Sequence, residues 1–318
     1  MEKHQKLKFS ILILFFLSRI IFCQTANIIK RIPLPGIPSA SGIEFLNGKY
    51  YIIGDDSPWL FVLNTNFEIT DRIEIFDVKQ SVDGRIPKPI KPDYEAITFI
   101  KWGKDNDLLI FGSGTGEYRE NAVKIDFDKD GEIHKKEFKL EKLYKELRDE
   151  ADLSVQSFNI EGITQWKDYL LIMNRGMNNL FIIRTDDFKD FMKDDKKKIK
   201  IKAYNYILPS QKGNKAGFSG SCMLQDEDML LFTASIENTP DWISDGEILG
   251  SFIGFIDLND PLNTKPLCIP VKENGKNVLD KIESIINISK TDSYLEALAV
   301  TDNDNGRSDL LVLKINKK

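Results

Sequence analysis

Five short stretches of similar sequence decide the fold: SGIEF beginning at Ser41, EAITF at Glu95, EGITQ at Glu161, SGSCM at Ser219 and ESIIN at Glu283. Successive stretches begin 54 to 66 residues apart. Self-similarity at such a period indicates an array of like structural units. The first residue of each stretch carries a side-chain oxygen, in the order Ser, Glu, Glu, Ser, Glu. We therefore expect five repeated units that each place an oxygen ligand at an equivalent position.

The residues that follow each stretch predict antiparallel strands. In the first unit, the turn Asn47-Gly48 separates SGIEFL from KYYIIG, and the turn Ser57-Pro58 precedes WLFVLN. Short runs rich in Ile, Val, Phe and Tyr, broken by Gly, Asn, Asp and Pro, are typical of strands and hairpins. Four such strands per unit, repeated five times, predict an all-β fold, namely a five-bladed β-propeller with four-stranded blades.

The two ends of the chain predict how the ring closes. The last unit ends at its third strand, LLVLKI (residues 310–315), whereas a spare strand, ANIIKRIPL (residues 26–34), precedes the first unit. Pairing these two strands would close the ring and remove exposed sheet edges. We therefore expect residues 24–318 to form one domain, with LEKLYKELRDEA (residues 140–151) as its one helix.

Residues 1–23 have the features of a secretory signal peptide. Three lysines lie within the first eight residues, and the apolar run that follows is too short and too interrupted to span a membrane. We expect a secreted or periplasmic protein, with a lipoprotein anchored at Cys23 as the alternative. Two cysteines, Cys222 and Cys268, then remain; we expect two free thiols, and one disulfide is the alternative.

Composition excludes several kinds of function. The formal net charge is −5 and no basic stripe dominates, so nucleic acid is not expected as a partner. Only two histidines are present, which argues against a histidine zinc site or a Ser-His-Asp triad. We expect a monomer whose chemistry relies on carboxylates, arginines and a hard metal ion.

The repeat geometry places the predicted site at one mouth of the central channel, where closed β folds commonly bind ligands. Three glutamates brought together repel one another, and a hard cation with oxygen ligands relieves that repulsion. The predicted Ca²⁺ ligands are Ser41, Glu95, Glu161, Ser219 and Glu283. The turns after the second strands lie at the same mouth and supply the candidate catalytic residues Asp55, Arg119, Arg175 and Asp302.

A second calcium signal is DFDKDGEIHKKE (residues 126–137), which fits the spacing of an EF-hand loop. The preceding NAVKI reads as a strand rather than a helix. The stretch is therefore either a second calcium site or a plain Asp-Gly hairpin.

The site residues resemble those of the soluble calcium-activated nucleotidases, or calcium-dependent apyrases. The order Ser, Glu, Glu, Ser, Glu carries this resemblance, together with FLNGKYYIIGDD (residues 45–56) and GFSGSCMLQDED (residues 217–228). It implies a secreted five-bladed propeller with a calcium ion in the central channel. The chain departs from that family at Ser57, where the apyrases carry arginine. It is also similar to uncharacterised secreted bacterial propellers of the phytase-like, "esterase-like" group.

Two functions remain open. The first is a calcium-dependent hydrolase of phosphate esters or anhydrides, acting on a small phosphorylated substrate. Arg119 and Arg175 would clamp phosphate oxygens, and Asp55 or Asp302 would position or deprotonate water. The alternative is a non-enzymatic propeller with a structural calcium that binds a peptide, glycan or protein partner.

Overall fold

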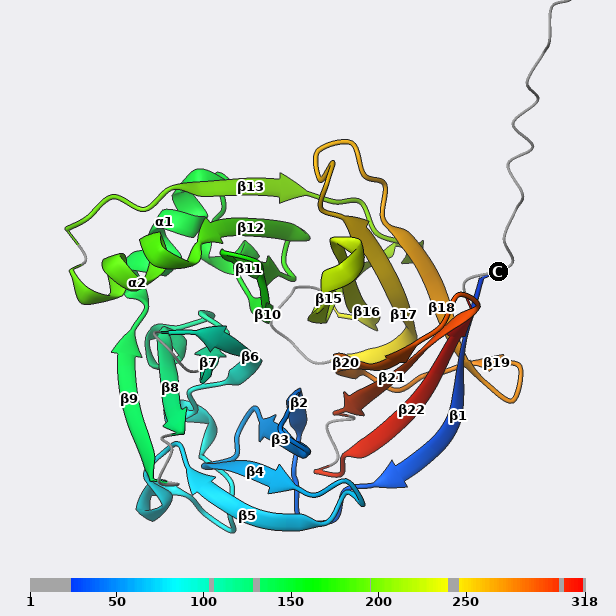
Figure 1. The fold of residues 1–318 in the computed structure, drawn as a ribbon, viewed down its shortest axis with the longest axis horizontal. Coiled ribbons are helices and arrows are strands. Elements are labelled where there is room, and N and C mark those ends of the chain that lie inside the picture. Colours follow the sequence, from blue (N-terminus) through cyan, green and yellow to red (C-terminus); the bar gives the residue numbers. More distant parts are fainter. Residues whose placement is uncertain are drawn as a thin grey trace, which may run out of the picture.

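The strands of the protein form sheets that stand around a central channel, which is a β-propeller arrangement (Figure 1). The computed structural model describes residues 24–102, 106–127, 132–194, 196–239, 246–302 and 306–316. The predicted signal peptide, residues 1–23, lies outside these ranges. Within them, the fold is all-β apart from short helices, as the sequence predicts.

Three sheets have four strands each, and the strands follow one another in chain order from the channel outward. The first sheet contains β2 (Ala40–Leu46), β3 (Lys49–Gly54), β4 (Trp59–Leu63) and β5 (Ile69–Glu74). The second contains β6 (Tyr94–Lys101), β7 (Asn106–Gly112), β8 (Asn121–Phe127) and β9 (Ile133–Lys139). The third contains β10 (Ile160–Trp166), β11 (Tyr169–Asn174), β12 (Asn179–Arg184) and β13 (Ile201–Asn205).

The rest of the ring is one ten-stranded sheet rather than two separate sheets of four. Its path begins with β14 (Ser210–Gln211), β15 (Asn214–Leu224), β16 (Met229–Asn238), β17 (Glu247–Asp257) and β18 (Leu267–Glu273). It continues through β1 (Thr25–Pro33), β22 (Asp309–Asn316), β21 (Tyr294–Thr301) and β20 (Ile282–Lys290), while β19 (Lys276–Asn277) pairs with β18. The two halves join because β1 also pairs in parallel with β18.

The inner strands surround the channel in a closed circle. Strand β2 contacts β6 and β20, β6 contacts β10, β10 contacts β15, and β15 contacts β20. Apolar side chains fill the space between neighbouring sheets; for example, Phe111 of β7 and Ile172 of β11 belong to one buried cluster. Apolar packing between neighbouring sheets therefore stabilises the circle of inner strands, and this packing does not occupy the face toward the channel.

The N-terminal strand closes the ring as predicted. Strand β1 runs antiparallel to β22, with Ile28 opposite Leu313 and Pro33 opposite Asp309. The guanidinium of Arg31 on β1 reinforces this junction, since it lies 2.9 Å from the carboxylate of Asp309 and 2.8 Å from that of Asp280. The first strand of the chain therefore completes the last sheet.

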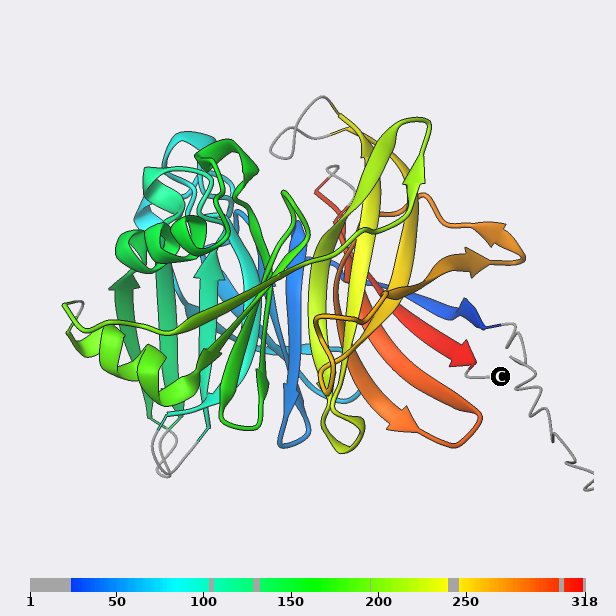
Figure 2. The ribbon, with the colours of Figure 1, turned by 90° about the horizontal axis from the view of Figure 1, so that it is seen from above.

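Two helices lie on the outside of the second and third sheets (Figure 2). Helix α1 (Glu141–Glu150) is the predicted one, and it buries Leu143, Tyr144 and Leu147. Helix α2 (Thr185–Lys193) was not predicted; it buries Phe188 and Phe191 against the same core. The 3-10 helices are η1 (Val78–Gln80), η2 (Lys88–Ile90), η3 (Glu117–Arg119), η4 (Val155–Ser157) and η5 (Gln225–Glu227).

The flanks of the possible EF-hand loop are both strands. Asp126 lies near the end of β8, and Glu137 lies within β9 opposite Val123, three residues along the ladder from Asp126. Residues 128–131 of the loop lie outside the described part of the chain. Strand flanks favour the hairpin interpretation over an EF-hand, which needs helices.

Two further expectations concern cysteines and membranes. Cys222 and Cys268 are free thiols, as predicted, and Cys222 is buried. Among the described residues, no helix is long and apolar enough to cross a membrane.

Neighbouring residues of β1 provide a test of ring closure. Ile28 is 8% exposed and packs in a cluster with Val271, Leu313 and Ile315, whereas Ile29 is 54% exposed. We expect Ile28→Ala to lower the free energy of unfolding by about 2–5 kcal/mol, since it leaves a cavity in that cluster. Ile29→Ala should change it by less than about 0.5 kcal/mol. Urea denaturation measures the free energy of unfolding of both variants. Equal losses in the two variants would contradict the role of β1 in closing the ring.

Candidate functional site

Each inner strand carries an extra residue at the first residue of the recurring stretch, and β20 has a second bulge at Ile288. The ladder between β2 and β3 pairs Ala40 with Gly54 and Gly42 with Ile53, so Ser41 has no residue opposite it. The same one-residue bulge isolates Glu95 in β6, Glu161 in β10, Ser219 in β15 and Glu283 in β20. A bulge re-aims the extra side chain away from the regular alternation. The five residues therefore occupy equivalent positions around the channel.

The residue after each bulge is small, and the structure gives the reason. A Cβ atom added to Gly220 would lie 2.4 Å from the backbone oxygen of Glu283 on the neighbouring inner strand. At Gly220 the two inner strands thus approach too closely for any side chain, whereas a Cβ added to Gly42 would meet the side chains of Ile97 and Ile53. The equivalent residues are Gly42, Ala96, Gly162 and Ser284.

The two serines of the ring bind the neighbouring strand. Ser41 donates a hydrogen bond to the backbone oxygen of Tyr94 (2.5 Å), and Ser219 donates to that of Ile282 (2.6 Å). Each acceptor directly precedes a ring glutamate, so the serines fix the strands that carry Glu95 and Glu283. A donating hydroxyl keeps its oxygen lone pairs for a further partner. Neither serine lines the cavity described next.

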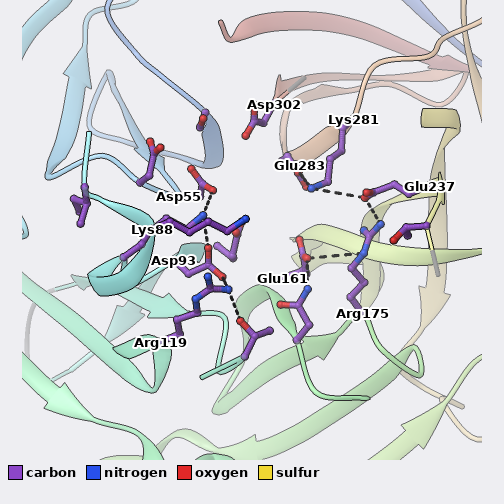
Figure 3. A pocket seen from close by; sticks show the side chains of 18 of the residues that line it. Asp55, Lys88, Asp93, Arg119, Glu161, Arg175, Glu237, Lys281, Glu283 and Asp302 are labelled. Carbon is purple, nitrogen blue, oxygen red and sulfur yellow. Dashed lines mark hydrogen bonds and ion pairs between the residues drawn. The ribbon is translucent and has the colours of Figure 1, made fainter. Parts of the chain in front are cut away.

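The three ring glutamates line a cavity of about 680 Å³ at the channel mouth (Figure 3). This volume suits a small molecule. The lining is dominated by charged side chains of both signs. The carboxylates are Asp55, Asp56, Asp93, Glu95, Glu161, Glu237, Glu283 and Asp302. The basic side chains are Arg85, Lys88, Lys91, Arg119, Arg175, Lys215 and Lys281.

A first ion cluster, made of Asp55, Lys91, Asp93 and Arg119, lies on the side of the first two sheets (Figure 3). The ammonium of Lys91 lies 2.5 Å from Asp55 Oδ2 and 2.7 Å from Asp93 Oδ1. Asp93 also pairs with the guanidinium of Arg119 at 2.9 Å. Arg119 is therefore engaged with a carboxylate of the protein itself.

A second ion cluster lies across the cavity and contains Glu161, Arg175, Glu237, Lys281 and Glu283 (Figure 3). Arg175 is 4% exposed and its guanidinium lies 2.5 Å from Glu237 Oε1 and 4.0 Å from Glu161 Oε1. Lys281 lies 2.8 Å from Glu283 Oε1. Arg175 is thus buried and paired, and it does not present a free guanidinium to the cavity.

Glu95 interacts electrostatically with carboxylates of both ion clusters. Within the described part of the chain, its carboxylate has no side-chain hydrogen bond or ion pair. Burial, and then the carboxylates of Asp93, Glu161, Asp55 and Glu283, raise its pKa well above the usual range. Carboxylate oxygens of Asp55, Asp93 and Glu95 all lie within 4.8 Å of one another. This trio is a candidate cation site of hard oxygen ligands, and it overlaps the predicted ring at Glu95.

Burial also sets the protonation of the neighbouring acids. It raises the pKa of Asp55 to about 6, against the opposing effect of Lys91. It raises the pKa of Glu161 to about 7 and that of Glu283 well above its usual range. The pKa of Asp93 is lowered instead, because Lys91 and Arg119 together outweigh its burial.

The predicted catalytic residues all line the cavity, but the structure gives them different surroundings. Asp55 lies after β3 with its Oδ1 atom buried and without a hydrogen-bond partner, and Asp302 lies buried after β21. Arg119 and Arg175 lie in separate ion clusters on opposite sides of the cavity, so they do not converge on one point (Figure 3).

Asp93 and Lys281 are among the charged residues of the site that the sequence analysis missed. A signal for them existed, because each lies two residues before a ring glutamate. Their backbone oxygens accept equivalent hydrogen bonds, from the amide of Ser113 and from that of Asp302. The position two residues before the recurring stretch lines the cavity in four of the five units, at Ser39, Asp93, Asn159 and Lys281, but not at Gly217.

Comparison with known proteins gives a family without an assigned activity. The family described as "Family of unknown function (DUF6929)" matches residues 36–315. The chain belongs to this family. No curated protein matches the chain.

Several solved structures match the chain at low sequence identity. Glutaminyl cyclase from Myxococcus xanthus has a TM-score of 0.51 and 10% identity, over 92% of this chain and 97% of that one. An arabinanase from Bacillus subtilis has a TM-score of 0.46 and 13% identity, over 87% and 93%. PQQ-bound aldose sugar dehydrogenase from Streptomyces coelicolor has a TM-score of 0.42 and 12% identity, over 92% and 98%. At such identities the likeness to the glutaminyl cyclase concerns the fold and carries no activity to this chain.

Lys91→Met should test the first ion cluster. It leaves two buried carboxylates without their shared cation, and we expect a loss of about 3 kcal/mol in the free energy of unfolding at pH 8. The loss should be smaller at pH 5, because Asp55, with a pKa of about 6, is already protonated in the folded protein. Denaturation at both pH values measures this, with the exposed Lys79→Met as the control. A loss that does not depend on pH would contradict the ion-pair interpretation.

Proposed function

We propose that this chain is a secreted, calcium-dependent hydrolase of phosphate esters or anhydrides. The observation that supports it best is that Glu95, Glu161 and Glu283 reach one cavity from equivalent bulges, beside Asp55 and Asp93. Such a set of hard oxygen ligands in a cavity of small-molecule size suits a calcium ion and an anionic substrate.

Two features of the donor set fit a calcium ion. Glu283 Oε2 is a buried carboxylate oxygen without a hydrogen-bond partner, and a cation would satisfy it. The lining of the cavity holds eight carboxylates and seven basic side chains, so carboxylates are in excess by one formal charge. Glu95, Glu161 and Glu283 would hold the calcium ion, with Ser41 and Ser219 contributing hydroxyl lone pairs.

In this proposal different residues of the chain have different roles in the reaction. A bound calcium ion would neutralise charge on the phosphate oxygens. Asp55, with its unpartnered oxygen and a pKa of about 6, would accept a proton from the attacking water, and Asp302 would help to position it. Arg119 and Arg175 would act as positioning residues that hold carboxylates in place, rather than as the phosphate clamp that the sequence suggests.

The ring itself is best counted as five blades in this proposal. Strand β18 would be the outer strand of the blade that begins with β15, and β1 the outer strand of the blade that begins with β20. The parallel contact between β1 and β18 would then join two blades at their outer edges. Secretion of the domain from residue 24 onward is part of the same proposal.

A second candidate is a non-enzymatic propeller with a structural calcium. The observation in its favour is the internal pairing of Arg119 and Arg175, since a cavity whose cations already bind its own carboxylates is stable without a substrate. In that case the mouth would bind a peptide, glycan or protein partner.

Calcium binding is tested by melting the purified domain with calcium and with chelator. At a calcium concentration of 100 times the Kd, binding stabilises the folded protein by about 2.7 kcal/mol, so chelation should lower the melting temperature by several degrees. Glu161→Gln should remove this difference, whereas Glu137→Gln, on exposed β9, should keep it. No effect of chelator on the wild type would exclude the ring as a metal site. Loss of the effect in Glu137→Gln would assign the calcium to the loop at residues 126–137.

Catalysis is tested by phosphate release from nucleotides, phytate and p-nitrophenyl phosphate in the presence of calcium. Asp55→Asn should lower kcat by at least about 100-fold, because it removes the proton acceptor, while the calcium-dependent shift in melting temperature persists. Asp71→Asn on the exposed strand β5 is the matched control. Full turnover by Asp55→Asn would remove that residue from the mechanism, and no phosphate release by the wild type would favour the binding propeller.

A further inference from the structure

Two basic residues of the cavity differ from the other five. Five have a carboxylate partner within 3 Å, and these are Arg85, Lys91, Arg119, Arg175 and Lys281. Lys88 and Lys215 also line the cavity, but in the described part of the chain their ammonium groups have no ion pair or side-chain hydrogen bond. Both side chains are exposed. They are therefore the cations that remain available to a ligand.

The two lysines approach the cavity from opposite parts of the ring. Lys88 begins η2, in the connection between the first and second sheets, and lies near the first ion cluster (Figure 3). Lys215 lies at the start of β15, beside the two-residue strand β14. The inner strands β6 and β10 lie between these points along the circle on one side (Figure 1). A ligand that meets both ammonium groups must extend across the mouth.

We propose that Lys88 and Lys215 are the anion-recognition residues of the cavity, and that each binds one phosphate group of a small ligand that carries two separated phosphates. The proposal rests on the proposed function only for the phosphate class of the ligand. It assigns to this pair the recognition that the sequence suggests for Arg119 and Arg175.

The charge balance explains why the lysines, rather than the arginines, suit this role. A phosphate that drew Arg175 away from Glu237 would leave a buried carboxylate without its partner, which opposes binding. Lys88 and Lys215 have no such partner to lose. Exposed ammonium groups also attract anions over a distance of about one Debye length, roughly 8–10 Å, and salt screens that attraction.

Titration calorimetry with fructose 1,6-bisphosphate and fructose 6-phosphate tests the proposal, with calcium present throughout. The wild type should bind the bisphosphate more tightly than the monophosphate. Lys88→Gln and Lys215→Gln should each weaken bisphosphate binding by about 3–10-fold, and the double variant should lose the preference for two phosphates. Raising the salt concentration should weaken the wild type more than the double variant.

Matched controls exist on the same segments. Lys79→Gln in η1 lies in the same connection as Lys88, and Lys212→Gln lies in the same hairpin as Lys215; neither lines the cavity, so both should bind like the wild type. Equal wild-type affinity for the two sugars, or wild-type affinity in the double variant, would overturn the proposal. Absence of phosphate release would count against the hydrolase and not against this binding. The calcium-dependent melting shift should persist in both lysine variants, which separates the anion site from the metal site.

Discussion

The site depends on a repeated backbone irregularity. One extra residue in each inner strand shifts a serine or glutamate out of the regular alternation and toward the channel, at the same level in every sheet. Gly220 lets the next strand approach, and the hydroxyls of Ser41 and Ser219 bind the strands next to their own. The oxygen-rich ring is thus built into paired strands, which hold side chains more rigidly than loops do.

Charge balance is the second constraint, because so many carboxylates cannot be buried close together without cations nearby. The protein supplies most of these cations itself. Lys91 and Arg175 are held between acids from different sheets, and Lys281 lies between acids on β16 and β20 of the ten-stranded sheet. Lys91 and Arg175 thus join sheets across the mouth, and all three side chains are committed to the scaffold. A ligand of the cavity therefore depends on the charged groups that have no internal ion pair in the described part of the chain. These groups are Glu95 and the exposed lysines, Lys88 and Lys215.

The sequence predicts the repeated architecture well because the repeats are local patterns. The recurring stretches, the hairpin turns, the closing strand and the helix at residues 140–151 all follow from short-range periodicity. Helix α2 was missed because its nine residues replace a connection whose length varies between repeats. The ion pairs of Arg119 with Asp93 and of Arg175 with Glu237 were not foreseen, because a sequence shows the type of a side chain but not its partner. Asp93 was overlooked because its role depends on ion pairs with Lys91 and Arg119, which the sequence does not show.

Closure of the ring joins the two ends of the chain. Asn316 donates a hydrogen bond to Thr25, a residue 291 positions earlier, and the ladder between β1 and β22 joins equally distant segments. Contacts of such long sequence separation form late, since the loop they close carries a large entropic penalty. During synthesis, β1 is the first strand made, yet its partner is the last. The edge of β1 that pairs with β22 therefore stays open until translation has passed β22, and during this interval that edge is exposed to intermolecular strand pairing.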